Sequence, residues 1–357
     1  MNRHVLSRRV IAGAALIALA LAGCGKDDET PTPGGNGPAN EFAALSGALK
    51  ASGASFPNAF YQKALDEFSK VAENADITYN SVGSGTGKKE FGQGLTDFAG
   101  TDSTVKDSDG VAAGSFVYIP TVAAPITVSY NLSGVSKLQL SGDTLGKIFQ
   151  RDIKKWNDAA IAMDNPGVTL PDKDITVVHR SDGSGTTNNF TGYLTKASPS
   201  WKLGRGDSVA WPADTSAGDK NTGVAQLIKQ GDGAIGYVDF SDAKATGLTF
   251  AAIKNKDGKY IDPTLDGATA ALGGATVKDD LTYDPLDATG ASAYPITAPT
   301  YLLVKTSYTD ANKAKLVRGF VKWLLTDGQS FAAGVNFAKL PADLQQKALA
   351  QLNKVQG

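Results

Sequence analysis

The chain has 357 residues, of which 41% are hydrophobic and 20% are charged, with a formal net charge of -1. This is the composition of a globular protein, and the length predicts two lobes rather than a single core. A single cysteine, Cys24, excludes an internal disulfide framework, and with two histidines it leaves little material for a zinc or copper site.

The first residues have the pattern of an export signal. Arg3, Arg8 and Arg9 precede an apolar run from Val10 to Ala22, which is too short for a comfortable membrane span. The run closes on small residues before Cys24 and is similar to the lipobox of bacterial lipoproteins, in which the chain is cut before a lipid-bearing cysteine. An ordinary signal peptide with an incidental cysteine is the alternative, and the Arg8–Arg9 pair is a weak hint of twin-arginine export.

Residues 1–23 are therefore predicted to be a signal peptide. Their removal deletes three arginines and no acidic residue, which takes the formal net charge from -1 to -4. A mildly acidic protein has no broad basic face, so no nucleic-acid partner is expected. Any anion must be held by local geometry rather than by the overall field.

Residues 24–44 are predicted to form a flexible tether, because their prolines, glycines and charges cannot bury a core. Beyond the tether, strand patterns at 76–82, 97–101, 126–130 and 175–178 alternate with helical stretches at 58–71, 145–156 and 316–325. This alternation predicts an α/β fold with helices on both faces of a sheet.

Three glycine-rich turns each follow a predicted strand and precede a helix, at residues 52–57, 82–87 and 181–186. Each presents backbone N–H groups and a hydroxyl at the positive end of a helix, which suits an anion. One such turn alone is more often a simple helix cap, but three in one chain point to a tetrahedral oxyanion that needs donors on several sides.

Enzyme interpretations of the same residues fit poorly. The run from Gly83 to Lys88 is one residue too short for a P-loop, and Lys89 stands where a magnesium-binding hydroxyl is needed. Neither Ser84 nor Ser184 lies in a Gly-x-Ser-x-Gly elbow. His179 is predicted to be a packed or surface histidine, so the sequence shows no nucleophile–base pair.

Three charged residues near these elements are candidates for an anion-binding site. Asp102 follows the strand-like segment 97–101, and Arg180 and Asp182 flank the third turn. Isolated charges are usually solvated, but an arginine shortly before a helix start has a planar fork that suits an oxyanion.

Together these segments resemble the PstS family, the phosphate-binding proteins of bacterial phosphate ABC transporters. The resemblance runs from about Leu45 to the C-terminus, and its elements are residues 53–57, 82–87, 96–102, 154–157, 179–186, 233–237 and 294–297. The run from Arg180 to Thr186 is the most specific of them.

The resemblance implies site residues one by one. Ser55 and Phe56 would donate a hydroxyl and backbone N–H groups to phosphate, and Ser84 would be the second contact. Asp102 would be the acceptor, Arg180 the anion partner oriented by Asp182, and Ser184, Gly185 and Thr186 the final donor cluster. Ser55 stands where threonine is frequent in the family, and a contact from Thr86 is left open.

The resemblance also implies a type II periplasmic-binding-protein (Venus-flytrap) fold, with two α/β lobes and a hinge of two crossing strands near 125–128 and 295–299. The first lobe would comprise 45–126 and 297–357, and the second lobe 127–296. The protein would be a monomer without a cofactor or metal, lipid-anchored to the outside of a bacterial cell membrane. It would hand inorganic phosphate to ABC permease subunits.

Asp102 gives this expectation a physical basis for selectivity. A carboxylate only accepts hydrogen bonds, so it accepts from the proton of phosphate and repels fully ionised sulfate. The alternatives are a binding protein for another tetrahedral oxyanion, such as sulfate or molybdate, an exported phosphatase, and a surface adhesin with a vestigial pocket. A phosphatase would need a metal cluster or a nucleophile with a base.

Overall fold

The computed structural model describes residues 40–357, so Cys24 and the predicted signal peptide lie outside the described residues. The folded region begins earlier than the predicted end of the tether at residue 44. Phe42 is buried against Phe68, and the Asn40 side chain donates to the carbonyl of Val71. The core therefore extends back to Phe42, because this aromatic side chain packs against an apolar partner, while its neighbours Glu41 and Ala43 are exposed.

One mixed sheet organises the chain, in the order β2-β1-β3-β12-β4-β8-β6-β7, with β9 paired to β4. Its strands are β1 (Ser46–Gly53), β2 (Asn74–Ser81), β3 (Phe98–Thr101), β4 (Phe116–Asn131), β6 (Thr176–Arg180), β7 (Ser216–Gly218), β8 (Ala234–Asp239), β9 (Thr249–Phe250) and β12 (Thr297–Lys305). A separate small sheet contains β5 (Gln139–Leu140), β10 (Ala252–Lys254) and β11 (Tyr260–Ile261).

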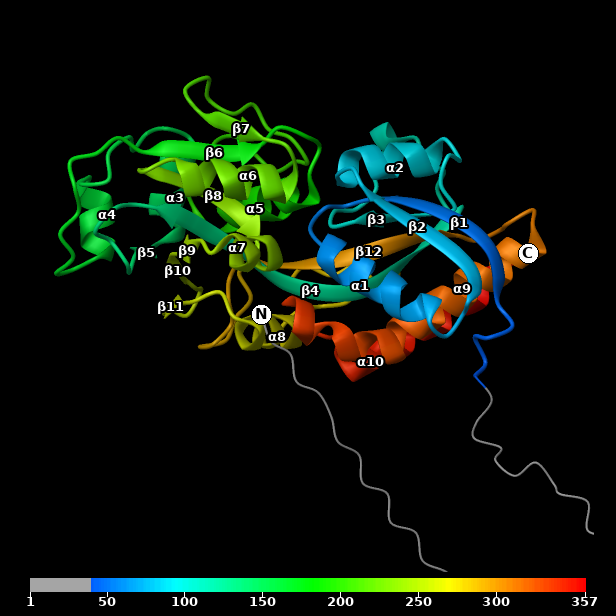
Figure 1. The fold of residues 1–357 in the computed structure, drawn as a ribbon. Helices are drawn as coiled ribbons and strands as arrows, with labels where there is room; N and C mark the ends of the chain where they lie inside the picture. Colours follow the sequence, from blue (N-terminus) through cyan, green and yellow to red (C-terminus); the bar gives the residue numbers. More distant parts are fainter. Residues whose placement is uncertain (1–39) are drawn as a thin grey trace, which may run out of the picture. The chain divides into compact units, whose positions relative to one another are not determined.

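The long strand β4 connects two halves of this sheet (Figure 1). From Phe116 to Pro125 it pairs antiparallel with β12, and from Ile126 to Asn131 it pairs with β8. We call the half with β1, β2, β3 and β12 the first lobe, and the half with β6, β7 and β8 the second lobe. The α/β two-lobe fold predicted from the sequence is confirmed.

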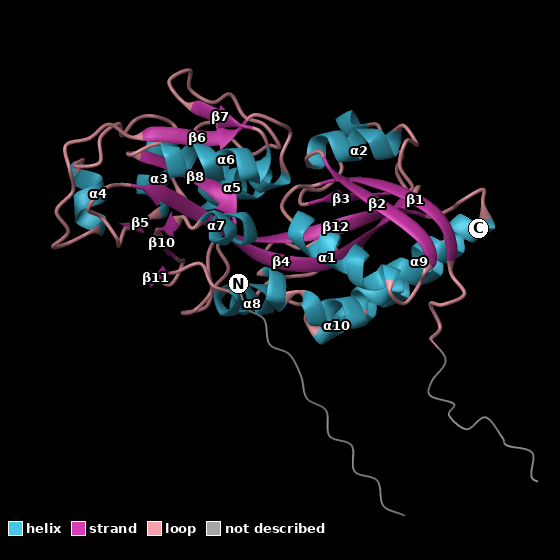
Figure 2. Ribbon diagram, in the orientation of Figure 1, coloured by secondary structure: helices cyan, strands magenta, loops and turns pink. Residues whose placement is uncertain are grey.

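Helices cover both lobes (Figure 2). The first lobe carries α1 (Asn58–Ser69), α2 (Ser84–Gly92), α9 (Ala311–Leu325) and α10 (Ala342–Gln351). The second lobe carries α3 (Gly142–Phe149), α4 (Ala159–Asp164), α5 (Gly185–Ala197), α6 (Lys220–Gln230) and α7 (Phe240–Thr246), and α8 (Leu265–Gly273) packs near β4 and β12.

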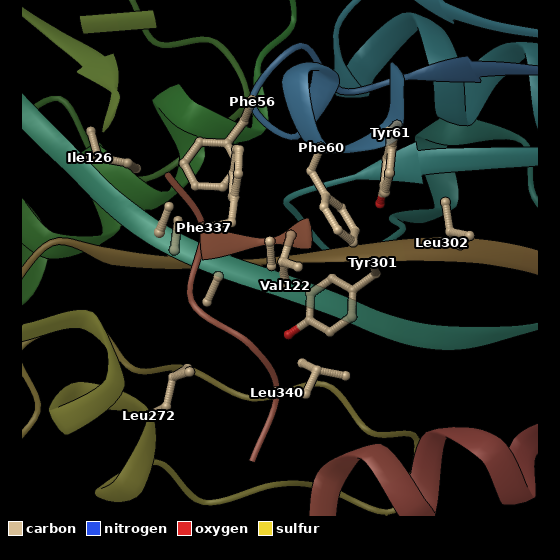
Figure 3. Packing of buried hydrophobic residues seen from close by; sticks show 14 of the residues in the cluster. Phe56, Phe60, Tyr61, Val122, Ile126, Leu272, Tyr301, Leu302, Phe337 and Leu340 are labelled. Carbon is tan, nitrogen blue, oxygen red and sulfur yellow. The ribbon is translucent and has the colours of Figure 1, made fainter. Parts of the chain in front are cut away.

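The predicted apolar stripes of two helices face the core. Phe60, Ala64 and Phe68 of α1 are buried, and so are Phe320 and Trp323 of α9. Phe56 and Phe60 pack with Phe337 above β4 and β12 (Figure 3). This aromatic layer fixes the turn before α1, because burial of large rings is the main favourable contribution to packing.

The helix predicted over 145–156 is wrong in its second half. The helix α3 ends at Phe149, and Arg151 has a left-handed φ of 70°. The amides of Asp152 and Ile153 both donate to the Lys147 carbonyl, which closes the helix. Trp156 is nonetheless buried, with its indole N–H donating to the Gly233 carbonyl, so its apolar character reports core burial rather than helix.

Candidate functional site

The three glycine-rich turns occupy the predicted positions between a strand and a helix. The first turn joins β1 to α1, the second joins β2 to α2, and the third joins β6 to α5. Ser84 is the first residue of α2, and Ser184 caps α5 by accepting from the Thr187 amide at 3.1 Å. Each turn therefore directs a helix start and a hydroxyl residue toward the region between the lobes.

The second and third turns lie against each other across the two lobes. The Gly85 amide donates to the Gly183 carbonyl at 2.9 Å. Gly83 has a φ of 84°, and a Cβ at this position would lie 2.4 Å from an oxygen of Asp182. Only glycine permits both this conformation and this approach.

Ser84, Asp102 and Gly185 meet at one point. The Asp102 amide donates to the Ser84 hydroxyl oxygen at 3.2 Å. A Cβ on Gly185 would lie 2.6 Å from both the Cβ of Asp102 and the Ser84 hydroxyl. Residues from the second turn, from the segment directly after β3 and from the third turn are thus brought together, although 83 positions of sequence separate Asp102 from Gly185.

The Asp102 carboxyl is buried and only partly satisfied. It is 3% exposed, and its Oδ1 has no hydrogen-bond partner within residues 40–357. Burial raises the pKa of Asp102 from 3.8 to about 7, while the Thr300 hydroxyl and the charge of Arg180 act in the opposite direction. An acceptor atom without a partner at a buried position indicates a place for a donor from outside the protein.

Arg180 and Asp182 form a two-point ion pair at the edge of this cluster. The Arg180 Nε donates to Asp182 Oδ1 at 2.7 Å, and Nη2 donates to Oδ2 at 2.5 Å. Burial alone would raise the pKa of Asp182, but the hydrogen bonds and charge of Arg180 hold it below its ordinary value. The remaining nitrogen, Nη1, lies 3.4 Å from the Thr186 hydroxyl oxygen. The arginine is therefore held in one orientation next to the third turn.

The first turn reaches the same region through its serine. The Ser55 hydroxyl oxygen accepts from the Asn221 side chain, which also donates to the Thr186 hydroxyl oxygen, with both distances at 3.2 Å. The Phe56 ring lies in the aromatic core 5.7 Å from the Phe337 ring, so only its backbone is available to a ligand. Thr86, whose role was left open, is exposed.

His179 lies in a packed environment, which is one of the two settings expected from the sequence. Its ring stacks on Trp211 with centroids 4.8 Å apart and contacts the Thr215 hydroxyl at 3.0 Å. Burial lowers the pKa of His179, which favours the neutral form of the ring. Its two ring nitrogens are thus engaged with Thr215 and the Arg180 carbonyl rather than with a serine of the three turns.

Sequence reasoning missed four polar residues of this region. They are buried or nearly so, and they connect the lobes through side-chain hydrogen bonds: Lys88, Asn189, Asp207 and Asn221. Asn221 is the second residue of α6, which follows β7 after Asp219 alone, and this fourth strand-to-helix junction was a usable signal. Lys88 and Asp207 are 119 residues apart, and no local pattern marks such a pair.

The described part of the chain holds neither a candidate metal cluster nor a candidate membrane-spanning helix. Within residues 40–357 no three His, Cys, Asp or Glu side chains are grouped so as to hold a metal ion. Over the same range, no helix has the length and apolar character needed to cross a membrane.

Comparison with known proteins gives a consistent family assignment. The model of the PBP superfamily domain matches residues 38–328. A protein of Xylella fastidiosa named phosphate-binding protein PstS is 34% identical over 340 residues, which cover 92% of each chain. A protein of the same name from Methanocaldococcus jannaschii is 35% identical, with 97% of this chain and 95% of that protein covered.

Solved structures agree on the fold. A high-affinity periplasmic phosphate-binding protein, solved with bound phosphate, matches with a TM-score of 0.71 at 22% identity, covering 85% of this chain and 93% of that one. A phosphate-binding protein from Stenotrophomonas maltophilia matches with a TM-score of 0.66 at 22% identity, covering 85% of this chain and 94% of that one. At these identities the likeness concerns the two-lobe architecture.

Proposed function

Because the chain belongs to the PstS family of phosphate-binding proteins within the PBP superfamily, we propose that it binds inorganic phosphate outside the cytoplasm and delivers it to an ABC-type import permease. The observation that carries the proposal is the meeting of Ser84, Asp102 and Gly185 between the lobes. A tetrahedral anion needs donors on several sides, and helix starts from both lobes supply them here.

Each site residue has a proposed role that its chemistry supports. The hydroxyls of Ser55, Ser84, Ser184 and Thr186 and the backbone N–H groups of Phe56 and Gly185 donate to phosphate oxygens. Arg180 supplies the positive charge, and Asp182 holds the guanidinium in place through its two-point pair. Charge-assisted bonds of this kind contribute about 1.5–3 kcal/mol each.

Asp102 is the proposed selectivity element. Its free Oδ1 accepts the proton that phosphate still carries near neutral pH, and sulfate has no proton to donate. Sulfate would leave a buried acceptor without a partner and would place an anion against a carboxyl group. The cost of the unpaired group is about 1–3 kcal/mol, and charge repulsion adds to it.

Contacts between the lobes support a hinged mechanism. The Gly85–Gly183 and Asn221–Ser55 hydrogen bonds exist only when the lobes meet. The crossing strands β4 and β12 are the proposed hinge, with the first lobe at 45–126 and 297–357 and the second at 127–296. Phosphate favours closure because the closed state makes more contacts with it.

Membership of the family supports a proposal for the location and the partners. We propose that the chain is a binding protein and not an enzyme, that it works as a monomer, and that its partners are permease subunits in the membrane. Cys24 would carry the lipid, including a palmitate, that anchors the mature chain after residues 1–23 are removed.

Calorimetry on the chain from Gly25 onward tests the proposal directly. Phosphate and arsenate, which both carry a proton, should bind with one site per chain, and sulfate should not compete at a hundredfold excess. Tighter binding of sulfate or molybdate would identify a different oxyanion binder. Turnover of a phosphate monoester, with or without zinc, would identify a phosphatase instead.

A further inference from the structure

Asn221 is a buried amide placed between the two lobes. It is fully buried, and it lies one residue inside α6, after β7. The turn that carries it is tied to the arginine pair, because the Lys220 amide donates to Asp182 Oδ1 at 3.2 Å. The start of α6, which carries Asn221, is therefore anchored by the same carboxylate that orients Arg180.

The amide nitrogen contacts one hydroxyl from each lobe. Its Nδ2 lies 3.2 Å from Ser55 Oγ of the first lobe and 3.2 Å from Thr186 Oγ1 of the second. An amide nitrogen has two hydrogens and accepts nothing, so it serves both oxygens as a donor at once. Ser55 and Thr186 are thereby acceptors toward Asn221.

The hydrogen bonds from Asn221 determine the direction in which the two hydroxyl groups can donate their own hydrogens. A hydroxyl has one hydrogen and two lone pairs. The Thr186 oxygen receives Asn221 and also lies 3.4 Å from Arg180 Nη1, so both of its lone pairs face donors. Its own hydrogen must then point to a third group, and an anion is an acceptor in that direction. Ser55 has one lone pair engaged by Asn221, so its hydrogen points away from the amide and is free to donate to an anion.

We propose that Asn221 is a positioning residue, which holds the Ser55 and Thr186 hydroxyls as acceptors so that both O–H groups donate to the bound oxyanion. Because Ser55 and Thr186 belong to different lobes, one amide both joins the lobes and sets the direction of two hydrogen bonds to the ligand. The inference rests on the proposed function and adds to it a residue that contributes through its neighbours.

The test is a set of double-mutant cycles read by phosphate calorimetry. Asn221→Ala should weaken phosphate binding by about tenfold or more, because two oriented donors to an anion are lost. In the Ser55→Ala background, and separately in the Thr186→Val background, the same change should cost clearly less, because the hydroxyl it acts through is already gone.

A second buried asparagine provides the matched control. Asn165 in the second lobe bonds only backbone groups, of Gln139 and Ile161. Asn165→Ala should lower the melting temperature and leave phosphate affinity unchanged. If Asn221→Ala fails to fold, Asn221→Leu keeps the approximate shape of the amide without its donor and enters the same cycles.

The outcomes are distinct. Wild-type affinity in Asn221→Ala, or an equal loss in all backgrounds, would overturn the positioning role while leaving phosphate binding intact. A wild-type chain that binds no phosphate would overturn the proposed function itself and this inference with it.

Discussion

At the scale of single residues, the Asp102 carboxyl is the group that should separate phosphate from sulfate. Asp102→Asn replaces one carboxyl oxygen by an amide NH2 group that can donate a hydrogen bond. Sulfate, which has no proton to donate, then meets a donor instead of a carboxylate acceptor. We expect the affinity ratio of phosphate to sulfate to fall by about 5- to 150-fold, which corresponds to about 1–3 kcal/mol. Competition calorimetry measures the ratio.

Asp158→Asn is the control for that substitution. Asp158 caps α4 by accepting from the Ala160 amide, and asparagine caps a helix equally well. The affinity ratio of phosphate to sulfate in Asp158→Asn should stay at the wild-type value. An unchanged ratio in Asp102→Asn as well would remove Asp102 from the selectivity mechanism.

The raised pKa of Asp102 also makes the stability of the ligand-free protein depend on pH. Between the ordinary value of 3.8 and about 7, the folded protein keeps a proton that the unfolded chain has released. Asp102 therefore lowers the free energy of unfolding as pH rises through this window, by at most about 1.4 kcal/mol per pH unit. Urea unfolding at pH 4 to 7.5 should show that Asp102→Asn lacks this part of the slope, and identical slopes would contradict it.

At the scale of elements, the start of α5 approaches β3 and α2 so closely that only glycine fits. A Cβ on Gly185 would lie 2.6 Å from Asp102 Cβ and the Ser84 hydroxyl. Gly185→Ala should therefore keep the lobes apart and abolish measurable phosphate binding, while each lobe stays folded. Calorimetry and circular dichroism together test this. Gly273→Ala at the end of α8, where a Cβ meets nothing within 4 Å, should bind like the wild type.

The helix α2 is also joined to the second lobe by a buried cation. Lys88 Nζ lies 3.0 Å from Asp109 Oδ2 and 2.9 Å from Asp207 Oδ2, and the lysine is fully buried. Lys88→Met leaves two carboxylates without their partner, so we expect a loss of about 3–5 kcal/mol in the free energy of unfolding, measured in urea.

An exposed ion pair provides the comparison for the loss of stability expected in Lys88→Met. Lys63 and Glu67 are an i,i+4 pair on α1 with side chains 38% and 20% exposed. Lys63→Met should change stability by less than about 1 kcal/mol. A loss in Lys88→Met no larger than this would show that water reaches the buried pair.

Local sequence predicted most elements but not all of their ends. The stripe of α1 and the three glycine turns were correct because side-chain periodicity and backbone requirements are local. The helix over 145–156 was too long because a buried Trp156 extends an apolar pattern beyond the point at which Arg151 turns the backbone. Over a segment this short, a buried irregular stretch and a buried helix face produce the same spacing of apolar residues in the sequence.

At the scale of the whole molecule, the strand order of the sheet brings the candidate site residues together. The sheet brings β3 next to β12 and β12 next to β4, although residues 102–296 separate β3 from β12 in the chain. The resemblance to PstS proteins predicted that these distant residues meet at one site, whereas the residue patterns alone did not predict it. The contacts between Lys88 and Asp207 and between Asn221 and Ser55 have large sequence separations, so they follow from the three-dimensional fold alone.

The proposed closure of the two lobes around phosphate predicts that the global stability of the protein depends on that ion. A ligand that binds only the folded protein adds RT ln(1 + [L]/Kd) to the free energy of unfolding, or about 2.7 kcal/mol at a hundredfold excess over Kd. Phosphate should produce this gain in urea unfolding, and Gly185→Ala should not gain. Sulfate at the same concentration should give only the small general effect of a salt excluded from protein surfaces. An equal gain from both anions would mean that the lobes do not close on a specific ion.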